Sequence, residues 1–128
     1  MKLVLASHNQ GKLQELSAIL EPAVAGLELV SYDGPEPVED GISYLENALI
    51  KARAAHAHTG LPAIADDSGI AVEILGGSPG IFTAIWSGTK DNVANRQLLL
   101  AQLKDIHEEH RGAAFVCTIA LVSEEGEQ

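Results

Sequence analysis

The sequence has few of the residue types that mark secreted, membrane-bound or nucleic-acid-binding proteins. Its single cysteine, Cys117, excludes an internal disulfide framework and fits the reducing cytoplasm. Only 8 lysines and arginines stand against 18 aspartates and glutamates, and the resulting net charge of -10 disfavours binding to DNA or to anionic lipid. No apolar run is long enough to span a membrane, and residues 1–6 are too short for a signal peptide. We therefore expect a cytoplasmic protein without nucleic acid or membrane as a partner.

A zinc site and a cysteine nucleophile are also disfavoured. His56 and His58 are separated by one residue and would lie on different sides of a helix, while His107 and His110 flank a polar stretch of solvated character. Cys117 lies within the apolar run 114–122, so we expect it to be a small buried residue.

The length and the pattern of apolar residues indicate the fold class. With 128 residues, 46% of them hydrophobic, the chain is long enough for one domain with one core, residues 1–128, and it carries no repeat or linker. We predict an α/β fold, a mixed sheet flanked by helices. The expected strands are residues 2–6, 29–32, 63–66, 71–74 and 114–122, and the expected helices are residues 12–20, 42–55 and 92–106, with Gly60 stopping the second helix.

Two adjacent carboxylates, Asp66 and Asp67, follow the short apolar run 61–65 and precede Ser68 and Gly69. The run suits a strand that is buried on both faces, and carboxylates at its end would project into the crevice where open α/β sheets bind ligands. An ordinary turn explains the same residues, because Asp, Ser and Gly are turn formers. The motif therefore indicates either a metal site or a turn.

A polar loop links the first expected strand to the first expected helix. A helix start offers unpaired backbone N–H groups and the positive end of a dipole, and Ser7, Asn9 and Lys12 add donors beside it. This arrangement predicts a phosphate site, although Ser7 or Asn9 could equally cap the helix. The glycine pattern of a Walker loop is absent.

A further acidic group lies between these two motifs. Glu39 stands on the loop before the second helix, and Glu46 falls in the first turn of that helix, where the dipole favours an acidic residue. Taken alone, Glu39 is explained as a solvated charge and Glu46 as a residue typical of helix starts.

In this order, the motifs resemble the inosine/xanthosine triphosphate pyrophosphatase family, whose members hydrolyse deaminated purine nucleoside triphosphates to the monophosphate and pyrophosphate. The resemblance extends from the first strand to about Val122. The stretch that resembles the family's S/T-x-N-x-x-K loop is 5–12, and the further matching stretches are 39–41, 44–48, 51–52, 61–69 and 75–81.

The resemblance implies a magnesium-dependent, homodimeric enzyme that acts on ITP, dITP and XTP. It implies Glu39 and Asp67 as metal ligands, with Glu46 and Asp66 as further candidates, and Asp67 as the acceptor of a proton from the attacking water. The substrate-binding residues it implies are Ser7, His8, Asn9, Gln10, Gly11, Lys12 and Ser68.

Two departures from the family pattern alter these expectations. Ile85 stands where relatives commonly carry an arginine, so any charge contact of that arginine is lost. Residues 123–128 form an acidic tail where family members continue into G-F-G-Y-D-P-like and S-H-R-G-like runs, which are implied to grip the base and part of the phosphate chain. We therefore expect a fold without its C-terminal part, and an inactive nucleotide-binding or assembly fragment is the alternative to an enzyme.

Overall fold

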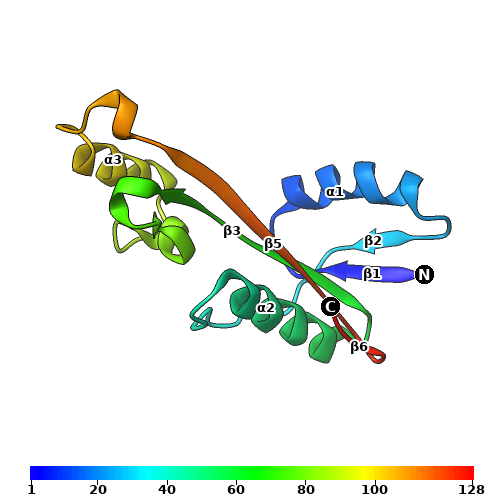
Figure 1. The fold of residues 1–128 in the computed structure, drawn as a ribbon. Helices are drawn as coiled ribbons and strands as arrows, with labels where there is room; N and C mark the ends of the chain where they lie inside the picture. Colours follow the sequence, from blue (N-terminus) through cyan, green and yellow to red (C-terminus); the bar gives the residue numbers. More distant parts are fainter. The chain divides into compact units, whose positions relative to one another are not determined.

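The chain opens with a strand, a loop and a helix, as its hydrophobic pattern predicts. The computed structural model describes residues 1–128, and in it β1 (Lys2–Leu5) leads into α1 (Gln10–Ala23) and then β2 (Glu28–Val30) (Figure 1). The remaining helices and strands are α2 (Tyr44–Thr59), β3 (Ala63–Val72), β4 (Ser78–Pro79), α3 (Asn92–Gln102), β5 (Ala113–Ser123) and β6 (Gly126–Glu127), with 3-10 helices η1 (Glu73–Leu75), η2 (Gly80–Ile85) and η3 (Glu108–His110).

The strands form one mixed sheet in the order β2-β1-β3-β5-β6, with β4 paired to β3. β1 is parallel to both β2 and β3, whereas β4 runs antiparallel to β3 and β6 antiparallel to β5. This arrangement confirms the predicted α/β class. None of the helices combines the length and apolar character needed to cross a bilayer.

Two compact units make up the chain. The first comprises residues 1–66 and 119–128 and the second residues 67–118, so β3 and β5 each contribute to both. We describe each unit by itself, and the single domain predicted from the sequence stays a prediction.

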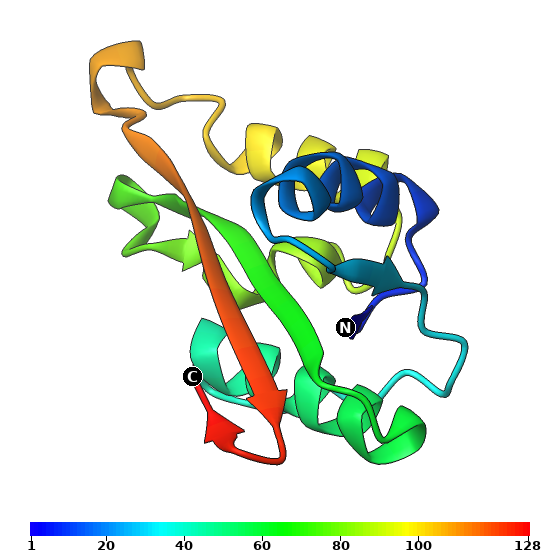
Figure 2. The same cartoon turned by 90° about the vertical axis from the view of Figure 1, so that its right-hand side faces the viewer.

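In the first unit, α1 and α2 cover opposite faces of the sheet (Figures 1 and 2). Alternation along β1 explains this, because Leu3 and Leu5 pack with leucines of α1 while Val4 packs with Ala52 and Ala55 of α2. Both alanines are fully buried, and their small side chains let α2 lie close to the strands.

The caps of α2 explain its bounds. The Ser43 side chain accepts a hydrogen bond from the Glu46 backbone N–H at 3.1 Å, and Gly60 ends the helix in the left-handed conformation with φ 73. The predicted stop at Gly60 is therefore confirmed.

Three sequence-based expectations were wrong. β3 continues without a break to Val72, so Asp66 to Gly69 form neither a turn nor the end of a strand, and residues 73–75 are 3-10 helical. Cys117 is exposed on β5 instead of buried. α3 ends at Gln102, because the Arg111 guanidinium donates to the carbonyl oxygens of Leu103 at 2.6 Å and Ile106 at 2.9 Å and so satisfies the backbone of a turn that follows the helix.

Candidate functional site

The loop between β1 and α1 is shaped by its own side chains. Asn9 caps α1, with its Oδ1 accepting from the Lys12 backbone N–H at 3.0 Å. Ser7 Oγ accepts from the Asn9 backbone N–H at 3.0 Å. Gln10 and Gly11 form the exposed first turn of the helix. The cap predicted as one interpretation is confirmed, and it leaves the exposed N-terminus of α1 compatible with the other interpretation, phosphate binding.

Lys12 is held by a carboxylate that is distant in the sequence. Its Nζ lies 2.8 Å from Asp66 Oδ1, and the two side chains are 34% and 20% exposed. The sequence implied separate roles for the two residues, in phosphate and in metal binding, and the structure joins them in one ion pair. The charge of Lys12 is thus fixed beside the loop by β3.

Asp66 and Asp67 project from opposite faces of β3, because successive side chains of a strand alternate. The preceding residues show the same alternation: Ile64 packs in the core on the α1 side, and Ala65 packs in the core on the α2 side. The structure therefore does not direct the two neighbouring carboxylates toward one point.

The other two candidate metal ligands lie around the start of α2. Glu39 Oε1 is 3.1 Å from Lys51 Nζ, so this loop carboxylate faces a cation of the helix. Glu46 Oε2 accepts a hydrogen bond from the Ile42 backbone N–H at 2.8 Å, which matches the helix-start interpretation.

A buried amide fixes the loop that carries Glu39. Asn47 is only 3% exposed and its Oδ1 accepts from the Gly41 backbone N–H at 2.8 Å. A Cβ on Gly41 would lie 2.7 Å from that oxygen, so glycine is required at this close approach. Sequence reasoning missed Asn47 as a positioning residue, although an asparagine beside the buried alanines of a helix is the signal that could have found it.

The carboxylates have the oxygen chemistry that magnesium prefers. No three or more His, Cys, Asp or Glu side chains lie close enough to hold a metal ion together. Mg²⁺ usually keeps several waters and binds through one or two carboxylates together with substrate phosphates. Exposed carboxylates such as Glu39 therefore fit magnesium by donor type, and the complete ligand set stays a prediction.

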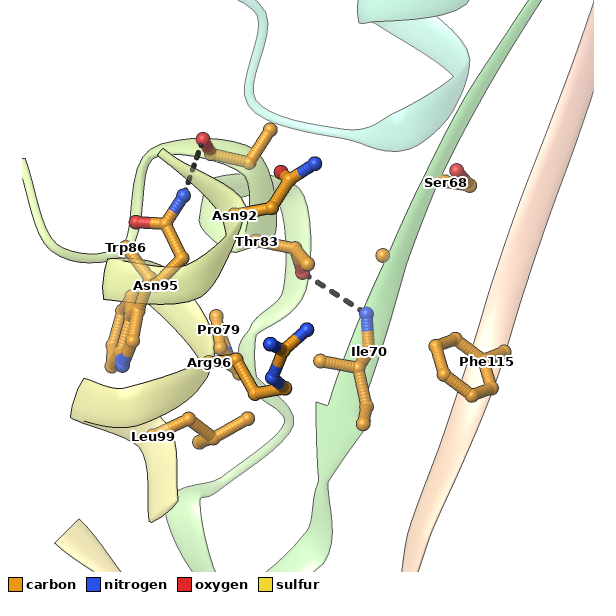
Figure 3. A pocket seen from close by; sticks show the side chains of 12 residues that line it. Ser68, Ile70, Pro79, Thr83, Trp86, Asn92, Asn95, Arg96, Leu99 and Phe115 are labelled. Atoms are coloured by element: carbon orange, nitrogen blue, oxygen red, sulfur yellow. Dashed lines mark hydrogen bonds between the residues drawn. The ribbon is translucent and has the colours of Figure 1, made fainter. Parts of the chain in front are cut away.

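The second unit contains a mostly apolar pocket of about 390 Å³ (Figure 3). Ser68 is the one predicted site residue that lines it. The guanidinium of Arg96, on α3, points into the pocket toward Ile70 of β3 (Figure 3). The apolar part of the lining is formed by Ile70, Pro79, Ala84, Leu99 and Phe115.

Two polar side chains that sequence reasoning missed build the walls of this pocket. Thr83 Oγ1 accepts from the Ile70 backbone N–H at 3.0 Å (Figure 3). It also donates to the Gly80 carbonyl oxygen at 2.6 Å, so it connects η2 to β3. Asn95, 7% exposed, donates from Nδ2 to the Ala84 carbonyl oxygen at 2.8 Å and accepts from the Ser87 backbone N–H at 2.7 Å.

The sheet is mixed, helices cover both of its faces, and the chain begins with a strand, a loop and a capped helix. These features define an α/β protein in which helices pack on a central sheet. The chain belongs to the Ham1 family, whose model matches residues 3–128.

Known relatives and solved structures agree with this membership. The chain is 56% identical to a dITP/XTP pyrophosphatase of Leifsonia xyli subsp. xyli over 99% of its own length and 64% of that protein. A crystal structure of the nucleoside-triphosphatase / dITP/XTP pyrophosphatase from Mycobacterium abscessus matches with a TM-score of 0.83 and 52% identity, covering 100% of this chain and 69% of that one. The Ham1 protein of Staphylococcus aureus matches with a TM-score of 0.83 and 32% identity, over 100% of this chain and 67% of that chain. The chain thus spans about two thirds of the length of these relatives.

Proposed function

We propose that this chain hydrolyses the deaminated purine nucleoside triphosphates ITP, dITP and XTP to the monophosphate and pyrophosphate. The observation that carries the proposal is the loop before α1, where Asn9 caps the helix and Lys12 stands beside the exposed N-terminus, in a member of the Ham1 family. Relatives about half identical in sequence are named dITP/XTP pyrophosphatase.

In the proposed reaction the chain binds the phosphates and removes a proton from water. Backbone N–H groups at the start of α1, the side chains of Ser7 and Ser68, and Lys12 would hold the phosphate oxygens and stabilise the charge that moves to the leaving pyrophosphate. The Lys12 ammonium has three N–H donors, so it can contact a phosphate of the substrate while it stays paired with Asp66. When bound, magnesium would offset the charge of the triphosphate.

Asp67 is the proposed acceptor of the proton from the attacking water. Its carboxylate is partly buried, and a carboxylate within hydrogen-bond reach of a water molecule can act as a general base. Glu39 is the other proposed metal ligand, with Glu46 and Asp66 as additional candidates. The mechanism needs no covalent intermediate.

The test is release of pyrophosphate by the 128-residue chain. ITP, XTP, ATP and GTP would be compared with Mg²⁺ and with EDTA, with Lys12→Ala as the variant and Lys104→Ala, which removes an exposed lysine elsewhere, as the matched control. Release from ITP and XTP that EDTA abolishes and Lys12→Ala weakens is the expected result. Binding of ITP without release of pyrophosphate would support the nucleotide-binding alternative instead.

We also propose that the chain forms a homodimer in the cytoplasm. Two large apolar side chains of η2, Phe82 and Ile85, are 53% and 46% exposed, and a second copy would remove such a surface from water. The location rests on the low cysteine content of the sequence, which is typical of proteins of the reducing cytoplasm. Sedimentation across micromolar concentrations tests the dimer, and a monomer throughout would contradict it.

A further inference from the structure

His8, in the middle of the loop before α1, has a hydrogen-bond acceptor beside each of its ring nitrogens. Its Nε2 is 2.7 Å from the carbonyl oxygen of Gly34, and its Nδ1 is 3.2 Å from Oε1 of Glu36. Both partners belong to one short segment after β2, so a single side chain connects the loop to that segment.

A neutral imidazole cannot satisfy both contacts. It carries one N–H and one lone pair, whereas a carbonyl oxygen and an ionised carboxylate only accept hydrogen bonds. One neutral tautomer directs a lone pair at Gly34, and the other directs it at Glu36. The doubly protonated ring removes this conflict, because both nitrogens are then donors and the ring charge pairs with the carboxylate.

The segment that carries these acceptors is fixed by its own contacts. The Tyr32 hydroxyl donates to the Pro35 carbonyl oxygen at 2.6 Å, and Tyr32 is only 5% exposed. A Cβ on Gly34 would lie 2.5 Å from the Tyr32 ring, so the turn requires glycine there. Burial raises the pKa of the Tyr32 hydroxyl, and the charges of Asp33 and Glu36 raise it further, so the phenol stays a neutral donor.

Tyr32 links His8 to further titratable groups. The His8 and Tyr32 ring centroids are 5.6 Å apart, a distance at which an imidazolium is attracted to the ring face. His58 meets Tyr32 edge-on at 5.6 Å, and its Nε2 is 3.9 Å from Asp33, which is 97% exposed. Among these groups Glu36 and Tyr32 contact His8 directly, and Glu36 is the one that pairs with it. The ammonium of Lys12, at the start of α1, is paired with Asp66.

We propose that His8 is a positioning residue whose doubly protonated ring latches the loop before α1 to residues 34–36 and so holds the proposed phosphate site in shape. Affinity for a triphosphate should therefore be higher when the His8 ring is doubly protonated than when it is neutral. This consequence rests on the proposed function, whereas the latch itself does not.

The first test measures binding of inorganic tripolyphosphate by calorimetry in EDTA at pH 5.5 and pH 8.0. His8→Gln keeps a donor for Gly34 and removes the charge. His58→Gln, a histidine that also contacts Tyr32 but lies outside the loop, is the matched control. Because the pair is partly exposed, the wild type should bind about 3-fold more tightly than His8→Gln at pH 5.5 and about equally at pH 8.0. For His58→Gln, the ratio of the affinity at pH 5.5 to the affinity at pH 8.0 should equal that of the wild type.

Glu36→Gln separates the latch from a simple charge effect. If His8 and Glu36 act through one contact, the double variant with His8→Gln and Glu36→Gln should bind tripolyphosphate no more weakly than either single variant at pH 5.5. Additive losses, or a His8→Gln chain that keeps the wild-type dependence on pH, would overturn the latch.

A second readout requires no phosphate. The backbone amide NMR signals of Gly34 and Glu36 should move between pH 5.5 and 8.0 in the wild type and in His58→Gln but stay in place in His8→Gln. Equal movement in all three chains would refute the latch. If tripolyphosphate binds none of the chains while the amide signals behave as expected, the proposed function fails and the latch stands.

Discussion

Asn95 offers the sharpest test of how the second unit is held together. Its buried side chain makes two hydrogen bonds, to the carbonyl oxygen of Ala84 and to the N–H of Ser87, at 2.8 and 2.7 Å. Asn95→Ala leaves both backbone groups without these partners. The loss of a hydrogen bond from a buried group costs about 1–3 kcal/mol, and water can reach the exposed Ala84 more readily than Ser87. Because alanine also favours the helix by roughly 0.6 kcal/mol, we expect a net loss of about 2 kcal/mol.

Urea denaturation measures this loss. With an m-value of about 2 kcal/mol/M, the midpoint should fall by about 1 M. Asn92→Ala is the matched control, because Asn92 lies one turn earlier on α3 and is exposed, and its midpoint should move by less than about 0.3 M. Equal midpoints for Asn95→Ala and the wild type would refute the view that this amide joins η2 to α3.

Three further predictions concern the proposed chemistry and the response to pH. Asp67→Asn keeps the size and removes the basicity, so turnover of ITP should fall about 100-fold or more while binding is better preserved, as steady-state kinetics would report. Lys12→Ala should raise the KM for ITP and leave the urea midpoint close to that of Lys104→Ala, because Lys12 is not a core residue. Hydrogen bonds from Arg53 at 2.6 Å lower the pKa of the Glu127 carboxyl in the folded chain, so this pair stabilises the fold above the ordinary glutamate pKa and ceases to do so as the pH falls through the lower folded value. Glu127→Gln should therefore lose less stability between pH 5 and 3 than the wild type does, and parallel stability curves would contradict this.

The first half of the fold could be predicted because its signals are local. Alternation along β1, the spacing of leucines in α1 and the glycine that ends α2 each depend on residues near one another in the sequence. The Asn9 cap was predictable for the same reason. Local patterns of this kind survive in the folded chain because tertiary packing reinforces them.

Long strands could not be predicted in the same way. Residues 66–69 have turn-forming composition, yet β3 passes through them and continues to Val72, and its last two residues pair with β4. The place of β3 between β1 and β5, two strands that are distant in the sequence, overrides local propensity here. Cys117 was misjudged because an apolar run of β5 does not reveal which of its residues another element covers.

The contacts within the candidate site depend on pairs far apart in the sequence. Lys12 and Asp66 are separated by 54 residues, and His8 and Gly34 by 26. The sequence identified Lys12 and Asp66 as candidates through motifs, but only the parallel pairing of β1 with β3 explains why they meet. Motifs therefore named Lys12 and Asp66 as candidates but did not predict the ion pair that joins them.

The alternation of β3 bears directly on how two neighbouring carboxylates could serve one reaction. A regular strand directs Asp66 and Asp67 to opposite faces, so a single ion cannot be bound by both without a change in the backbone. Asp66 is already paired with Lys12, and its effect on a triphosphate would be exerted through that ammonium. Asp67, on the other face and partly buried, stays the proposed residue for the chemical step. Substitution of Asp66 should therefore alter affinity first, and substitution of Asp67 should alter turnover first.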